Sequence, residues 1–252
     1  MYIIAIALQG NIEEQLFQLI AVYNYAITYK RNIYINNNHI DEDLRILIND
    51  FNANKNELIK INLINECEFN KIPFYFYKEK LTEEKDIPEI NFNLCIQGSF
   101  KTIKYFNNKT IEFIAKLFLN INNDFYNKAV AIINNITIEN KTVMYIKKIT
   151  GFSNEPDIIY YNNAYEMLGD NERNIIIISD DYEWAKGLLS INPNFHFISN
   201  ENKCIQMIIM MLVPVIINSN SYLTWWASHI NKTKVIVPKT SNIIKINNSI
   251  CI

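Results

Sequence analysis

Glycine is scarce in this chain, with 5 residues among 252. Neither a P-loop nor an intact Gly-x-Gly-x-x-Gly fingerprint is present, although both motifs use glycines to bring the backbone close to phosphate groups. Their absence leaves a nucleotide-binding oxidoreductase as the least favoured of the functional hypotheses below.

Cysteine and histidine are also few, and their spacing matches no known metal or catalytic motif. No two cysteines form a Cys-x-x-Cys pair, which argues against a zinc site, and we expect no resident metal. No histidine has a Ser, Cys or Asp partner at a known spacing, so we interpret the histidines as structural or surface residues. Without a disulfide framework, the default expectation is a reducing compartment. The residues are Cys67, Cys95, Cys204, Cys251, His39, His196 and His229.

Neither a strong charge of one sign nor a long apolar run is present. The formal net charge of -2 excludes a basic field over the molecule and, with it, non-specific binding of nucleic acid. The longest apolar run, residues 205–217, is interrupted by a Gln and a Pro and is too short to span a bilayer. Residues 1–8 are apolar but lack the basic region of a signal peptide. We therefore expect a cytoplasmic protein without a membrane span.

The first half of the chain begins as a β-α-β unit and then becomes polar. A short apolar run precedes Gly10, and apolar residues then recur at helical spacing before the next strand. The expected strands are 2–8, 32–35 and 93–98. The expected helices lie near 16–27, 44–51, 58–63 and 109–134, and residues 77–86 are expected to form a solvated excursion.

The second half alternates strands and helices more regularly, which predicts a parallel sheet with right-handed crossovers. Ligands of such sheets bind beyond the carboxyl ends of the strands. The change of rhythm places a domain boundary near 140, giving domains 1–140 and 141–252. The expected strands are 142–147, 174–179, 195–198, 214–218 and 234–237, and the helices are 160–168, 182–190, 202–212 and 221–230.

Two of these strands end in polar residues that suit a ligand. One ends at Ser179-Asp180-Asp181, where Ser179 or Asp180 can cap the next helix, or a carboxylate can reach a nucleoside. The other ends at residues 218–221 and leads into an aromatic helix. The free N–H groups and the dipole of a helix start attract anions, and the hydroxyls of Ser221 and Thr224 would add donors. The alternative for the second end is an ordinary helix cap above two core tryptophans.

Six segments, in the right order, resemble blocks of the bacterial-type α-1,2-fucosyltransferases, glycosyltransferase family 11. Together the blocks cover roughly residues 8 to 240. Gln15–Gln18 resembles the end of the family's GGLGNQMFQ block, Gly98–Phe106 its GYFQSEKYF, Tyr160–Ala164 its YYxxA, Ser179–Trp184 its SDDxEW, Asn220–Ala227 its NSTFSWWgA and Val235–Lys239 its VIAPK.

The resemblance implies an α/β protein of the GT-B-like class, with two Rossmann-like domains facing a cleft. Domain 1–140 would be the acceptor side and domain 141–252 the donor side. The implied activity is inverting transfer of fucose, or a related sugar, from a GDP-sugar to a galactoside-type glycan acceptor. The GDP-sugar is a co-substrate, and neither a metal nor another cofactor is implied. The implied donor-binding residues are Tyr145, Asp180, Asp181, Asn220, Ser221 and Thr224.

The chain departs from the family in its basic block, HxRRGD. Tyr145 stands for the His, Lys147 and Lys148 stand for the two Arg, and Ile149 and Thr150 replace the Gly-Asp pair. A lysine keeps the positive charge but loses the bidentate fork of arginine. Lys147 and Lys148 are nevertheless the candidate catalytic residues, because they would stabilise the leaving diphosphate. Strand alternation predicts that only one of them faces the cleft.

The chain also departs in the first block, where residues 10–14 replace GGLGN. Glu13 and Glu14 would oppose a bound diphosphate by about 1 kcal/mol or more each at about 4–6 Å. The alternative is a solvated first helical turn, where acidic residues are favoured. Two main hypotheses therefore remain: an active glycosyltransferase with an altered donor site, or a degenerate GT-B scaffold that binds a glycan or a protein partner.

Overall fold

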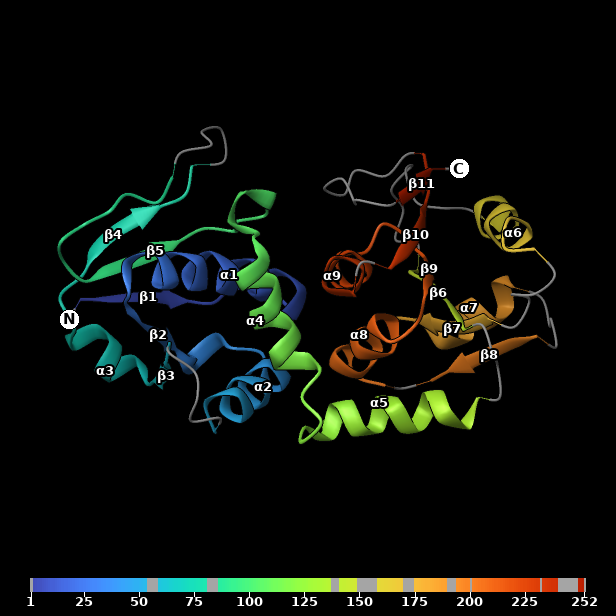
Figure 1. Cartoon of the computed structure of the whole chain (residues 1–252), viewed down its shortest axis with the longest axis horizontal. Coiled ribbons are helices and arrows are strands. Elements are labelled where there is room, and N and C mark those ends of the chain that lie inside the picture. The colour runs from blue at the N-terminus through green and yellow to red at the C-terminus, as the bar shows by residue number, and fades with distance from the viewer. Residues whose placement is uncertain are drawn as a thin grey trace. The chain divides into compact units, whose positions relative to one another are not determined.

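The structure, a computed structural model, divides into two compact units, Met1–Leu117 and Phe118–Ile252. Each unit has its own parallel sheet (Figure 1), which confirms the predicted pair of α/β domains. The second unit begins before residue 140, because α5 (Asp124–Asn135) packs along α8 (Lys203–Met211). The described residues are 2–53, 59–80, 86–136, 141–148, 158–169, 175–189, 194–199, 201–231, 233–239 and 249–251.

Among the described residues of the first unit, five parallel strands lie in the order β3-β2-β1-β5-β4. The chain runs outward from β1 to β3 and then returns to the other side of β1, so the direction of winding reverses between β1 and β5. The strands are β1 (Ile3–Ala7), β2 (Asn32–Asn36), β3 (Ile61–Ile64), β4 (Tyr75–Lys78) and β5 (Leu94–Gln97). The helices are α1 (Ile12–Tyr29), α2 (Glu42–Ala53), α3 (Glu66–Lys71) and α4 (Asn108–Phe118), with 3₁₀ turns η1 (Asn37–His39) and η2 (Ile103–Tyr105).

One helix expected in the first unit is wrong, and a stretch expected to be only a solvated excursion begins within a strand. The helical pattern near 58–63 is replaced by β3, whose partner is β2, and Asn62 Nδ2 donates to the Ile33 carbonyl at 3.1 Å. The excursion expected at 77–86 overlaps β4, an edge strand that leaves Phe76 70% exposed; residues 81–85 lie outside the described part of the chain. Both strands depend on hydrogen bonds to a neighbouring strand, which a local pattern does not reveal.

In the second unit, six described strands are parallel, in the order β11-β10-β9-β6-β7-β8. The five expected strands are confirmed, and β11 is added at one edge. The winding reverses between β6 and β9. The strands are β6 (Thr142–Ile146), β7 (Ile175–Ser179), β8 (Phe195–Ile198), β9 (Val215–Ile217), β10 (Lys234–Val237) and β11 (Ser249–Cys251). The helices, besides α5 and α8, are α6 (Ile158–Glu166), α7 (Tyr182–Leu188) and α9 (Tyr222–Asn231).

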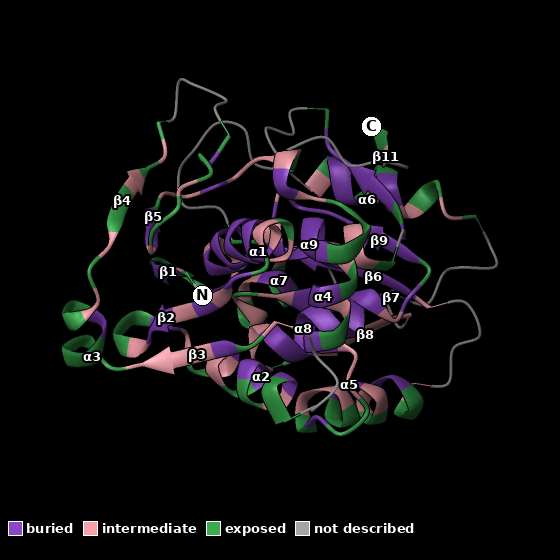
Figure 2. Cartoon of the chain, turned by 60° about the vertical axis from the view of Figure 1, so that its left-hand side comes forward, coloured by how far each residue is buried: buried purple, intermediate pink, exposed green. Residues whose placement is uncertain are grey.

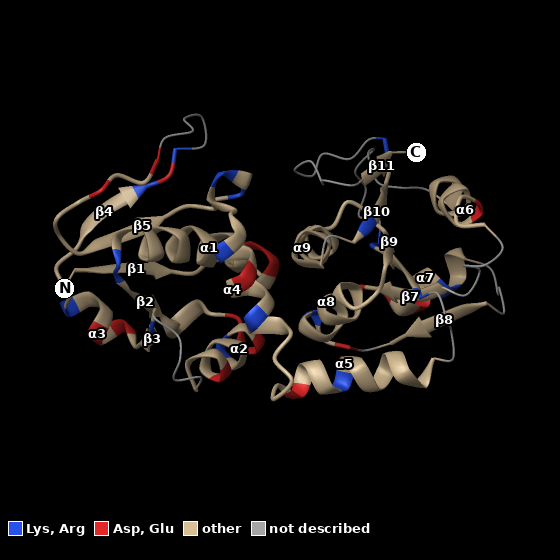
Figure 3. Cartoon of the chain, viewed as in Figure 1, with Lys and Arg blue, Asp and Glu red and all other residues tan. Residues whose placement is uncertain are grey.

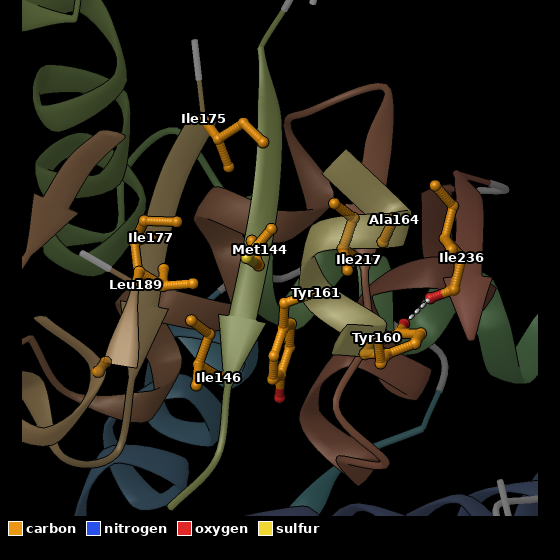
Figure 4. Packing of buried hydrophobic residues seen from close by; sticks show 11 residues of the cluster. Met144, Ile146, Tyr160, Tyr161, Ala164, Ile175, Ile177, Leu189, Ile217 and Ile236 are labelled. Carbon is orange, nitrogen blue, oxygen red and sulfur yellow. Dashed lines mark hydrogen bonds between the residues drawn. The ribbon is translucent and has the colours of Figure 1, made fainter. Parts of the chain in front are cut away.

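The core of the second unit lies on both faces of its sheet. On one face, Met144 and Ile146 of β6 pack with Ile177 of β7 against Tyr160 and Tyr161 of α6 (Figure 4). Burial extends along most of α8, from Cys204 to Met211 (Figure 2). Within the described part of the chain, no helix is long and apolar enough to cross a membrane.

Candidate functional site

The predicted donor segments of the second unit meet at the carboxyl edge of its sheet. Residues 147–148 follow β6, residues 180–181 follow β7 and residues 218–221 follow β9. The register pairs Met144 with Ile217 and Ile146 with Ser179, so the three strand ends are neighbours. This edge includes the reversal between β6 and β9, the position at which open α/β sheets bind ligands.

Asn218 is the central residue of this edge; it belongs to the predicted polar segment 218–221 but was not among the implied donor-binding residues, which in this segment begin at Asn220. It is fully buried directly after β9. Its Oδ1 accepts the backbone N–H of Ser221 at 3.0 Å and the hydroxyl of Thr224. These two donors fix the orientation of the amide, so its Nδ2 points away from them. That Nδ2 has no hydrogen-bond partner among the described residues.

The next residue, Ser219, also has a buried polar group without a partner. Its side chain is 2% exposed, and its Oγ has no hydrogen-bond partner in the described part of the chain. A buried polar group without a partner costs about 1–3 kcal/mol, and native proteins leave few such groups unsatisfied. Because they are adjacent and lie at the carboxyl edge, where open α/β sheets bind ligands, these two groups are the candidates for contact with a ligand. The sequence signal was available, because both residues directly follow a buried apolar strand.

The other predicted residues of this loop are used to build it. Ser221 Oγ accepts the Leu223 N–H at 3.1 Å and so caps α9, while Thr224 Oγ1 lies 2.8 Å from the Ser221 carbonyl oxygen. Asn220 has a φ of 59°, a left-handed conformation that asparagine tolerates better than most residues. Capping therefore accounts for Ser221 and Thr224. The helix behind them is anchored in the core by the buried Trp225 and Trp226.

Tyr160 of α6 holds this loop in place through hydrogen bonds. Its hydroxyl oxygen lies 2.9 Å from the Ile236 carbonyl oxygen (Figure 4) and 2.8 Å from that of Asn218. The residue is 7% exposed, and burial raises the pKa of its hydroxyl, so it remains a protonated donor. Tyr160 thus ties the ends of β9 and β10 to α6, which explains the first Tyr of the YYxxA segment.

Lys148 is held by two carboxylates at the same edge. Its backbone N–H donates to Asp180 Oδ1 at 2.8 Å, and its ammonium pairs with Asp181 Oδ2. Asp181 also accepts the Trp184 N–H at 3.0 Å, so Asp181 caps α7 in place of the expected Ser179 or Asp180. The hydrogen bond from Lys148, followed by that from Trp184, lowers the pKa of Asp181.

Lys147 differs from its neighbour, because its side chain has no partner among the described residues. Both lysines are exposed, and both follow the end of β6 at Ile146. Because both lie beyond the strand, the prediction from strand alternation that only one of them faces the cleft does not apply to them. What distinguishes them is the pairing of Lys148 with Asp181. Among the residues that the structure describes, positive and negative ones are interspersed over each unit and form no single basic field (Figure 3).

Tyr145 lies apart from these residues. It is a residue of β6 and is 2% exposed. Its neighbours Met144 and Ile146 belong to the cluster packed against α6, so alternation points Tyr145 to the opposite face of the sheet. The structure therefore places the Tyr145 ring in the core, whereas the other predicted residues lie at the carboxyl edge. Ile149 and Thr150, which stand for the Gly-Asp of the basic block, lie outside the described residues.

In the first unit, Glu13 and Glu14, the acidic residues that the altered first block introduces, both lie in the first turn of α1, and the contacts of Glu14 are defined. Glu14 forms a capping box with Asn11 at the start of α1, and its Oε1 pairs with Lys101 Nζ at 2.7 Å. The alternative stated above, that the acidic residue belongs to the first turn of a helix, is confirmed for Glu14. Because Lys101 compensates its charge, the repulsion expected toward a diphosphate is smaller than for an unpaired carboxylate.

Two buried glutamines of α1 hold the loop that follows β1. Gln15 Nε2 donates to the carbonyls of Gly10 at 2.9 Å and His39 at 2.8 Å, and its Oε1 accepts the Asp41 N–H at 2.9 Å. Gln18 makes a reciprocal pair with the backbone of Gln9, with both bonds at 2.9 Å. These bonds explain why the block that resembles the family begins and ends with glutamine.

Two parallel-sheet α/β units, with a polar loop and a helix start at the winding reversal of the second, define the architecture of GT-B glycosyltransferases. The chain is homologous to a bacterial glycosyltransferase: it is 24% identical over 279 residues to the O-antigen biosynthesis glycosyltransferase WbnK of Escherichia coli, covering 91% of each chain. No protein-family model matches it.

Solved fucosyltransferases share the fold. The fucosyltransferase NodZ from Bradyrhizobium superposes with a TM-score of 0.59 at 10% identity, covering 98% of both chains. POFUT1 in complex with GDP superposes with a TM-score of 0.58 at 9% identity, covering 92% of this chain and 95% of that one. The likeness establishes the GT-B fold of this chain.

Proposed function

We propose that this chain is a GDP-sugar-dependent glycosyltransferase that transfers fucose, or a related sugar, to a glycan acceptor with inversion. The observation that carries the proposal is the pair of buried, unpartnered groups at the start of α9, Asn218 Nδ2 and Ser219 Oγ. They lie at the carboxyl edge that includes the winding reversal of the second unit. One crystal structure of NodZ was soaked with GDP-fucose, and one of POFUT1 is a complex with GDP, which supports this choice of donor.

In this proposal the diphosphate of the donor lies at the start of α9. The dipole at the start of α9 favours an anion there, and Asn218 and Ser219 add two donors. Lys147 supplies the positive charge. As the acceptor hydroxyl attacks the anomeric carbon in line, these groups stabilise the charge that develops on the leaving diphosphate. No metal or further cofactor is part of the proposal.

In this proposal the two aspartates lie beside the diphosphate and do not bind it. Asp180 uses one oxygen to accept the Lys148 N–H at 2.8 Å, which leaves the other for a nucleoside hydroxyl. The acceptor is proposed to be a galactoside, attacked through its 2-hydroxyl, from the resemblance to family 11. The first unit is proposed as the acceptor side and the second as the donor side.

One observation favours a second candidate, a scaffold that binds a glycan or a protein without catalysis. The ion pair with Asp181 occupies Lys148, one of the two lysines that stand for the family's arginines. If Lys147 alone does not suffice, the donor site has lost its basic character.

Thermal-shift and calorimetric titrations separate the two candidates. We expect GDP and GDP-fucose to raise the melting temperature more than UDP, with no loss of the effect in EDTA. Equal shifts with GDP and UDP, or strict dependence on Mn²⁺, would contradict the proposed donor. A protein that binds no GDP-sugar but retains binding to a glycan is the non-catalytic scaffold.

A further inference from the structure

A cavity of about 160 Å³ lies in the first unit along the second half of α1. It is walled by α1, by η2 and by residues 86–87, and the donor site proposed above uses none of these residues. Asn24, one of its wall residues, comes twelve residues after the start of α1. At about 1.5 Å per residue, that places it about 18 Å along the helix from the carboxyl edge of the sheet.

Tyr105 of η2 gives this cavity its polar character. The residue is 5% exposed, its ring packs edge-on against Phe100 with centroids 5.7 Å apart, and it lines the cavity. Its hydroxyl has no hydrogen-bond partner among the described residues. Burial above all raises the pKa of Tyr105, and nearby Asp86 adds to this, so the hydroxyl is a neutral donor. The hydroxyl is not among the fully buried polar atoms, so it is open to the cavity and can donate to a ligand that supplies an acceptor.

The charges around the cavity cancel. Lys104 Nζ lies 2.8 Å from Asp86 Oδ1, and both residues line the cavity. An anion would have to compete with Asp86 for Lys104, and a cation would have to compete with Lys104 for Asp86. The Asp86 side chain is 90% exposed, so the pair adds little energy, but it leaves the wall without a net charge that would select an anion or a cation.

The remaining wall combines aromatic rings with neutral polar groups. Tyr25 and Tyr29 lie with ring centroids 4.5 Å apart. Asn24 Oδ1 accepts from Asn107 Nδ2 at 2.7 Å, which leaves Asn24 Nδ2 available to donate. At roughly 30 Å³ for each water, the volume holds about five waters or one small ring. A sugar ring matches this wall, because it has an apolar C–H face and hydroxyls that both donate and accept.

We propose that this cavity binds one neutral saccharide unit, with the Tyr105 hydroxyl and the Asn24 amide as donors and the Tyr25–Tyr29 rings as the apolar wall. The choice of a saccharide rests in part on the proposed function, since a glycan is the expected acceptor. The binding itself does not require catalysis, and it is measured without a donor.

The test uses lactose as a neutral saccharide probe. Its binding to the whole chain is measured by saturation-transfer NMR and by calorimetry. We expect lactose to bind the unmodified protein. Tyr105→Phe, which removes the hydroxyl and keeps the ring, should raise the dissociation constant by about two- to tenfold, the effect of one hydrogen bond. Thr28→Phe introduces a ring at an exposed position that lines the cavity and should abolish binding. Tyr75→Phe, on the exposed edge strand β4, is the matched control and should bind like the unmodified protein.

The outcomes distinguish this inference from the proposed function, because GDP binding is measured on the same samples. Absence of lactose binding in a protein that GDP stabilises would overturn the inference and leave the proposed function intact. Equal binding by Thr28→Phe and the unmodified protein would place the saccharide elsewhere and overturn it as well. Tighter binding of glucose 6-phosphate than of lactose, lost in Thr28→Phe, would show that the cavity selects anions.

Discussion

The ammonium of Lys148 is paired with the carboxylate of Asp181, the same carboxylate that caps α7. One residue earlier, Lys147 has no side-chain partner in the described part of the chain. Two adjacent lysines at one sheet edge therefore differ in their availability to a ligand, a difference that the sequence alone does not reveal.

The first prediction follows from this difference. Lys147→Ala should weaken GDP-sugar binding by roughly 1–3 kcal/mol, the range for a charged hydrogen bond, whereas Lys148→Ala should have a smaller effect. Lys147→Arg should preserve binding or improve it, because a guanidinium can hold two phosphate oxygens. Calorimetry with GDP-fucose measures all three variants. If both alanine variants bind as tightly as the unmodified protein, the lysines are structural.

The second prediction concerns acid stability. The pKa of Asp181 is lowered in the folded state, so its charged form stabilises the fold at pH values above the ordinary aspartate pKa. This contribution is lost as the pH falls through the lowered pKa, below about 4. Asp181→Asn should therefore lower the melting temperature at pH 7 but narrow the difference from the unmodified protein at pH 3. A difference that persists unchanged at pH 3 would show that the carboxylate charge has no part in it.

The third prediction tests the unpartnered amide of Asn218. Asn218→Asp keeps an acceptor oxygen for Ser221 and Thr224 but replaces the Nδ2 donor with a second carboxylate oxygen. We expect GDP binding to fall by at least about tenfold, because a donor is lost and a negative charge faces the diphosphate. The matched control is Asn202→Asp, at the start of α8, where the side chain also caps a helix. Comparable losses in both variants would argue against a specific role for Asn218.

The fourth prediction concerns the attachment of the loop to α6. Tyr160→Phe removes the hydroxyl that contacts the carbonyls of Asn218 and Ile236, leaving at least one buried acceptor without a partner. The free energy of unfolding should fall by about 1–3 kcal/mol in urea titrations. Tyr126→Phe on α5, whose hydroxyl makes no described hydrogen bond, should change it by about 0.5 kcal/mol or less. Equal effects in the two variants would show that the Tyr160 hydroxyl does not hold the loop.

Much of the fold is predictable from the sequence, because long apolar patterns determine it. Runs such as Ile175–Ile178 have only one reasonable interpretation, a strand buried on both faces. The failures are short polar segments: β3 contains an asparagine, and β4 exposes Tyr75 and Phe76. Such strands form because a neighbouring strand supplies hydrogen bonds, and that neighbour is distant in sequence.

The candidate site is predictable only to the level of the segment. The polar residues that follow β6, β7 and β9 were expected at one edge of the sheet, and the register of these strands makes the three strand ends neighbours. Which side chain faces a ligand depends on bonds made within each loop. Thr224 and Ser221 turn inward to Asn218, and this leaves the Asn218 Nδ2 as the available donor. Composition and spacing do not determine such orientations.

The hydrogen bonds of Gln15 have a consequence for motion. One amide joins the loop after β1, the turn after β2 and the segment that leads into α2. A displacement of any of these segments would break bonds to the other two, so they are expected to move as one rigid body. Any adjustment of the first unit to a bound molecule must therefore come from segments that Gln15 does not join.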